Sequence, residues 1–79
     1  MTVRLFARLR EIAGAEELAR DVPAGSSLGD VWRQLVDEWP ALAQFDTSVS
    51  GAVNAEYARM HRAVTEGDEV AFLPPVSGG

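Results

Sequence analysis

The residues of this sequence that can take part in chemistry lie at its C-terminal end, where Gly78 and Gly79 close the run Pro74-Pro75-Val76-Ser77-Gly78-Gly79. A terminal glycine carboxylate is the least hindered acyl group a polypeptide can offer, because glycine has no Cβ to block a narrow channel. The carboxylate becomes reactive only after a partner has converted its oxygen into a leaving group, as adenylation with ATP and magnesium does. Sulfur can then displace the adenylate to give a thiocarboxylate. We therefore expect Gly79 to be the reacting residue and Gly78 a slim spacer.

The proline pair before these glycines predicts that the tail leaves the folded body. Pro74 and Pro75 lack the N–H that a strand needs and favour an extended exit. Four residues beyond Pro75 span roughly 13 Å at about 3.3 Å each, which is long enough to thread a partner's slot. We expect a folded domain over 1–74 and a flexible tail over 75–79. The competing interpretation of the glycine pair is a frayed end or an expression scar.

The rest of the composition excludes several classes of function. With no cysteine and a single histidine, the sequence offers no thiol nucleophile, disulfide or ordinary zinc site, and we expect it to bind no metal or cofactor itself. The net charge of −5 disfavours nucleic-acid binding. The sequence contains no apolar run of about 20 residues and no signal peptide, so we expect a cytoplasmic protein without a membrane partner. All seven basic residues are arginine, so the chain has no lysine to accept a conjugated C-terminus.

The 79 residues predict a single domain whose first strand alternates polar and apolar residues. In this pattern Val3, Leu5 and Ala7 face the core, and Phe6 falls on the polar face. Phe6 is then either covered by a second layer or exposed for a partner.

Further patterns give the order of the remaining elements. We expect a short helix over 8–13 closed by Gly14, a strand over 18–22, and a helix that Ser27 caps and Pro40 ends. Strands follow over 49–54, 57–60 and 69–73. Trp32 and Trp39 fall on the apolar stripe of the longer helix and are assigned to the core. The order predicts an α+β fold of the β-grasp type, in which one long helix covers a mixed sheet of four to five strands. The first and last strands pair in its middle.

Three segments resemble the small subunit of molybdopterin synthase, the MoaD type of the MoaD/ThiS sulfur carriers. They are Phe6–Gly14, Ala52–Asn54 and the 13 consecutive residues Gly67–Gly79. The sequence departs from the family at His61-Arg62-Ala63-Val64, where an aspartate-histidine-proline run is common. We therefore assign no catalytic role to His61.

The resemblance implies a ubiquitin-like sulfur carrier that is not catalytic alone. A MoeB-type, E1-like partner would adenylate Gly79 with ATP and magnesium, and a sulfur donor protein would supply the sulfur. The loaded tail would enter a MoaE-type large subunit, which converts cyclic pyranopterin monophosphate to molybdopterin. By position, the residues that meet these partners are Phe6, Tyr57, Leu73, Pro74, Pro75, Val76 and Ser77.

Three other functions remain open on the sequence. The same glycine pair ends sulfur carriers for thiamine, cysteine or transfer-RNA thiolation. It also ends ubiquitin-like protein modifiers, which are attached to lysines of their targets. The third possibility is an interaction domain with an idle tail.

Overall fold

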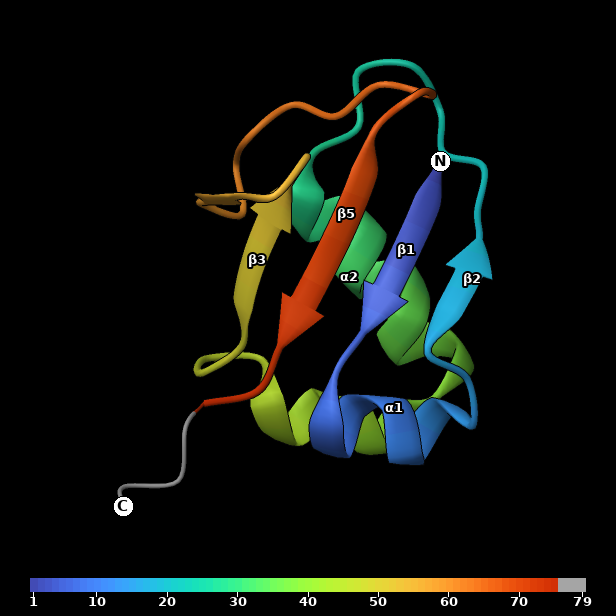
Figure 1. Ribbon diagram of the computed structural model, residues 1–79, viewed down its shortest axis with the longest axis vertical. Helices are drawn as coiled ribbons and strands as arrows, with labels where there is room; N and C mark the ends of the chain where they lie inside the picture. The colour runs from blue at the N-terminus through green and yellow to red at the C-terminus, as the bar shows by residue number, and fades with distance from the viewer. Residues whose placement is uncertain (76–79) are drawn as a thin grey trace.

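The structure is a computed structural model that describes residues 1–75. These residues fold around a five-stranded mixed sheet (Figure 1). The strand order across the sheet is β2-β1-β5-β3-β4. The bounds of the strands are β1 Thr2–Leu5, β2 Glu17–Ala19, β3 Ser50–Val53, β4 Glu56–Ala58 and β5 Glu69–Leu73. The range predicted for the last strand is confirmed at both ends. The strand predicted over 18–22 is shorter and begins one residue earlier.

The first and last strands lie side by side in the middle of the sheet and run parallel. Val3 pairs with Val70 and Leu5 with Phe72. β2 and β3 flank this pair on either side, both antiparallel to their neighbours. Because the strands come from opposite ends of the chain, their pairing joins the two halves of the sequence into one core. This arrangement confirms the predicted β-grasp fold.

Helix α2 (Leu28–Glu38) crosses one face of the sheet and buries the stripe of Leu28, Val31, Trp32 and Leu35 against it (Figure 1). Its first turn begins with the predicted capping box. The backbone N–H of Asp30 donates to Ser27 Oγ at 3.2 Å, and the Ser27 N–H donates to Asp30 Oδ2 at 2.9 Å. The Trp32 and Phe72 rings meet with their centroids 5.1 Å apart.

Trp39 lies at the C-terminal end of this helix and is only half-buried, with the Arg20 guanidinium 5.5 Å from its ring centroid. The assignment to the core therefore holds fully for Trp32 and in part for Trp39.

Two shorter helical segments accompany α2 instead of one long helix alone. Helix α1 spans Ala7–Ala13 and ends at Gly14, whose φ of 73° lies in the left-handed region that glycine adopts without strain. A 3-10 helix, η1, spans Pro40–Phe45 and buries Leu42. In Figure 1 both α1 and η1 lie at the end of the sheet toward which β1 and β5 point.

The prediction that Ala7 belongs to the core is wrong. β1 ends at Leu5, and Ala7 is the exposed first residue of α1, with a φ of 50°. Phe6 keeps an extended backbone, and its carbonyl accepts hydrogen bonds from the N–H groups of Leu9 at 3.1 Å and Arg10 at 3.5 Å. The chain therefore turns one residue after Phe6, before the alternating pattern is complete.

Candidate functional site

The sheet face opposite α2 is the candidate interaction surface, called the open face below. Side chains alternate along each strand, so the rows that pack under α2 contain Val3, Val70 and Phe72, which are buried. The row between them runs across all five strands. Its members are Glu17, Arg4, Ala71, Ala52 and Tyr57, as the strand register shows.

The parallel register of the central strands brings Phe6 and Leu73 together. Leu5 pairs with Phe72, so Phe6, which follows β1, and Leu73, which ends β5, come next at the same end of the two strands. Phe6 is 40% exposed, so the described chain does not cover it with a second layer. Leu73 is half-buried and pairs with Ser50 on the far side. Of the two interpretations of Phe6, the exposed aromatic holds.

Tyr57 is the most exposed large apolar residue among residues 1–75, at 77%. It lies on β4, opposite Ala52 in the register, and β4 is an edge of the sheet. Between Tyr57 and the Phe6–Leu73 pair the row contains only the small side chains of Ala52, which is buried, and Ala71, which is half-buried. The three apolar residues named from the resemblance thus lie on one face.

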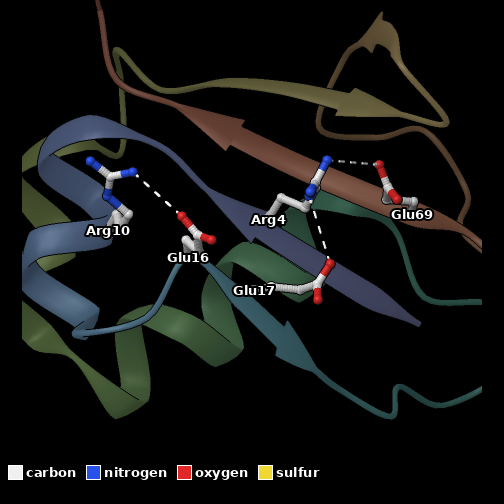
Figure 2. A network of polar contacts seen from close by, with 5 residues as sticks. All are labelled: Arg4, Arg10, Glu16, Glu17 and Glu69. Carbon is white, nitrogen blue, oxygen red and sulfur yellow. Dashed lines mark ion pairs between the residues drawn. The ribbon is translucent and has the colours of Figure 1, made fainter.

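The other half of the open face is charged, as Figure 2 shows. Arg4 lies between two carboxylates, 3.8 Å from Glu17 and 3.9 Å from Glu69, and Arg10 lies 3.5 Å from Glu16. These exposed pairs add little stability, about 0–1 kcal/mol each. A small hollow of about 130 Å³, lined by Arg4, Phe6 and Arg10 among others, joins the charged half to the aromatic one.

Sequence analysis missed this charged half. Arg4 gave a signal, because it alternates with Val3 and Leu5 and therefore had to lie on the face opposite the core. Glu17 and Glu69, the partners of Arg4, gave no such signal, because they are distant from it in sequence. Only the order of the strands places them on either side of β1.

The last described residues of the predicted site are Pro74 and Pro75, which continue from β5. Pro74 is half-buried, and Pro75 is exposed. Val76, Ser77, Gly78 and Gly79 lie outside the described residues, so their assigned roles and the domain boundary at residue 74 stay predictions.

A hydrogen-bonded turn holds the start of β5 in place. The carboxylate of Asp68 accepts the Thr65 N–H at 2.8 Å and the Asn54 side-chain N–H at 2.9 Å, and Asn54 Oδ1 accepts the Glu69 N–H at 3.0 Å. The donated Thr65 N–H, followed by the Asn54 amide, lowers the pKa of Asp68 below its ordinary value. This turn anchors β5 to the β3–β4 connection, so it fixes the strand that leads to the tail.

No three metal-ligating side chains come together among residues 1–75. His61 is exposed on the segment after β4. Within the same residues no helix is both long and apolar enough to cross a membrane.

Comparison with known proteins finds the same fold and related sequences. The molybdopterin synthase sulfur carrier subunit of Escherichia coli is 42% identical over 79 residues, covering 98% of this chain and 96% of that protein. The subunit of the same name from Arabidopsis thaliana is 39% identical, covering 98% of this chain and 80% of its relative. The crystal structure of SAMP1 from Haloferax volcanii superposes with a TM-score of 0.86 at 37% identity, covering 100% of this chain and 98% of that one.

The family model that matches is that of the ThiS family, and the match runs over residues 3–79. It therefore includes both the β-grasp body and the glycine pair. This chain belongs to the ThiS family, and several relatives that match nearly all of it are named sulfur carrier subunits of molybdopterin synthase.

Proposed function

We propose that this chain is the sulfur-carrying small subunit of a molybdopterin synthase, with the sulfur held on the carboxyl group of Gly79. The observation that carries the proposal is the position at which β5 ends. Leu73, its last residue, lies beside the exposed Phe6 on a face that also presents Tyr57. A surface for docking thus adjoins the strand that leads to the glycine pair, and relatives up to 42% identical have sulfur carrier names.

The chemistry of loading requires groups that a partner supplies. In a MoeB-type, E1-like enzyme, a carboxylate oxygen of Gly79 would attack the α-phosphate of ATP, and pyrophosphate would leave with magnesium balancing its charge. Sulfide from a donor protein would then attack the acyl carbon and displace AMP, which leaves a thiocarboxylate. If the donor holds the sulfur as a persulfide, the acyl disulfide formed first would need a thiol to reduce its S–S bond and release the thiocarboxylate. This chain contributes the acyl group and the docking surface. Gly78 leaves the partner's channel unobstructed, because it has no side chain.

Delivery of the sulfur would use the same open face on a second partner. A MoaE-type large subunit would bind Phe6, Tyr57 and Leu73, while Pro74 to Ser77 lead the thiocarboxylate to cyclic pyranopterin monophosphate. Because one face serves both partners, the carrier must leave the activating enzyme before it can enter the synthase. Competition between the two partners for the carrier is therefore expected.

Mass spectrometry of the purified chain tests this function. After incubation with a MoeB-type enzyme, ATP, magnesium and a sulfur donor, the mass should rise by the difference between a sulfur and an oxygen atom. Deleting Gly79 should abolish the increase and leave the circular dichroism spectrum unchanged, since the core lies within residues 3–72. Loading of the deleted chain at the normal rate would refute the assignment of Gly79. Failure of the loaded chain to convert the pterin with a MoaE-type subunit would refute the synthase role alone.

A second candidate is a protein modifier, favoured by the likeness to small archaeal modifier protein 1 of Haloferax volcanii, which is 37% identical over the whole of both chains. A modifier would appear in cells as covalent adducts through Gly79. Since this chain has no lysine, such adducts would contain one copy at each target lysine and no chains linked through its own side chains.

A further inference from the structure

Three of the seven arginines form no ion pair within residues 1–75. The four that pair with glutamates are Arg4, Arg8, Arg10 and Arg20. Arg59 and Arg62 lie on the segment that follows β4, and Arg33 lies on α2. The net charge of the chain is −5, so arginines without a carboxylate partner stand out on its surface.

Two adjoining hollows lie in this region, and Met60 lines both. One, of about 470 Å³, lies along β3 and β4 and is bordered by Arg59. The other, of about 260 Å³, lies along α2 and is lined by Trp32, Val36 and Arg33 among others. The two hollows share Met60 as a lining residue, and we call them together the β4 groove. Each of the two hollows is lined by apolar side chains and by one arginine without an ion pair in the described residues.

Backbone contacts hold the floor of the groove in place. The N–H groups of Leu28 and Gly29 donate to the carbonyls of Arg62 and Met60, both at 2.8 Å. A Cβ on Gly29 would come within 3.2 Å of the Met60 carbonyl oxygen, so the absence of a side chain permits this approach. The first amides of α2 are therefore satisfied within the chain, and the positive character of the groove comes from arginine side chains.

The free edge of the sheet at β4 is the third feature of the groove, beside the arginines and the hollows. In the described part of the chain β4 pairs with β3 alone, so the backbone groups on its other side are available to an added strand. The opposite edge, β2, follows Glu16 and begins with Glu17, whose carboxylates lie near Arg10 and Arg4. The arginines at that edge are therefore already paired and are not available to an acidic chain. β4 begins with Glu56 but is followed directly by Arg59.

We propose that the β4 groove binds an extended peptide segment of a partner protein in which acidic and apolar residues alternate. The segment would pair with the free edge of β4 as an added strand, a common mode of peptide recognition. Its acidic side chains would lie near Arg59 and Arg33, and its apolar ones would contact Met60 and Val36. Asp46, also on the groove wall, already accepts the Trp32 indole N–H at 2.8 Å.

The probe for this site is a fluorescein-labelled nonapeptide of alternating valine and glutamate, titrated into the full chain at roughly 0.15 M salt and followed by anisotropy. Backbone amide NMR shifts should map to Gly29, Arg33 and Ala58–Met60. The double variant Arg33→Glu/Arg59→Glu should weaken binding by about tenfold or more, since two attractive charges become repulsive. The matched control Arg4→Glu/Arg8→Glu changes the net charge equally, outside the groove, and should retain affinity within about twofold, because distant exposed charges are screened.

Three results would overturn the proposal. Equal losses in both double variants would mean that the peptide responds to net charge alone. Backbone amide NMR shift changes confined to Phe6, Ala71 and Leu73 would place the peptide on the open face. Equally tight binding of an oligothymidylate of matched charge, with the same dependence on Arg33 and Arg59, would indicate a general polyanion site. Sulfur loading of Gly79 is measured separately, so a failure here leaves the proposed function untouched.

Discussion

Gly51 on β3 lies directly beneath Leu28, the first residue of α2. A Cβ built on Gly51 would come within 2.5 Å of Leu28 Cδ2 and 3.3 Å of its Cγ. Leu28 is fully buried, so it has little room to withdraw. The absence of a side chain at position 51 therefore sets how closely the start of α2 packs on the sheet.

Gly51→Ala should lower the free energy of unfolding by about 1–3 kcal/mol, the usual cost of forcing an extra methyl group into a packed core. Urea unfolding of the purified chain measures the change. Gly67→Ala is the matched control, because a Cβ there meets nothing within 4 Å, and it should leave stability nearly unchanged. Equal stability of the Gly51 variant and the wild type would show that α2 shifts freely on the sheet.

Trp32→Ala should cost about 3–5 kcal/mol, because it leaves a cavity beside Phe72 and removes the donor to Asp46. For so small a domain this is a large share of the total stability. Trp32→Phe retains a ring against Phe72 and should cost distinctly less. Thermal unfolding monitored by circular dichroism compares the two, and similar losses would assign the effect to the hydrogen bond and not to the cavity.

Phe6→Asp should weaken partner binding while leaving the fold as stable or more so. Phe6 occupies the N-cap position of α1 and makes no side-chain cap hydrogen bond there. Aspartate is a preferred residue at that position and typically gains about 1 kcal/mol over a residue that cannot cap. On the proposed function, the exposed aromatic at this position serves partner binding, and that role would account for the unfavourable cap residue.

Calorimetric titration with a MoeB-type or MoaE-type partner measures the binding affinity of Phe6→Asp, and urea unfolding measures its stability. Ala43→Asp, which adds the same charge at an exposed position on η1, is the control and should bind normally. A parallel loss of stability and binding in Phe6→Asp would make Phe6 a structural residue.

Acid should destabilise the wild type more than Asp68→Asn. The pKa of Asp68 is lowered in the folded state, chiefly by the Thr65 N–H. Near the ordinary carboxyl pKa the folded protein therefore binds fewer protons than the unfolded chain does. Its contribution is present above that pKa and is lost as the pH falls through the lower folded-state value. The Asp68→Asn variant has no carboxylate to protonate at position 68, so its stability should fall less steeply as the pH decreases over the same range.

Chemical unfolding at a series of pH values below about 5 measures this difference. Asp37→Asn serves as the control, since the side chain of Asp37 is exposed and makes no hydrogen bond within the described chain. Identical pH profiles for wild type and Asp68→Asn would contradict a role for the turn in acid stability.

Local patterns in the sequence were sufficient to predict the elements that depend on neighbouring residues. The alternation of Val70 and Phe72 predicted β5, the Ser27–Asp30 pair predicted the start of α2, and Gly14 predicted the end of α1. Each is governed by contacts within a few positions along the chain, where spacing alone decides which groups meet. The glycine pair was likewise evident from residue type, and its chemistry stays a prediction from that type.

Only the tertiary structure decided which of these elements are neighbours and therefore what each face presents. The parallel register of β1 and β5 brings Phe6 beside Leu73, and the place of β1 between β2 and β5 puts Arg4 between Glu17 and Glu69. Ala7 left the core because the chain turned into α1 early, a choice its alternating pattern could not reveal. Contacts between residues distant in sequence depend on how the strands pack around one shared core, and no local pattern encodes that order.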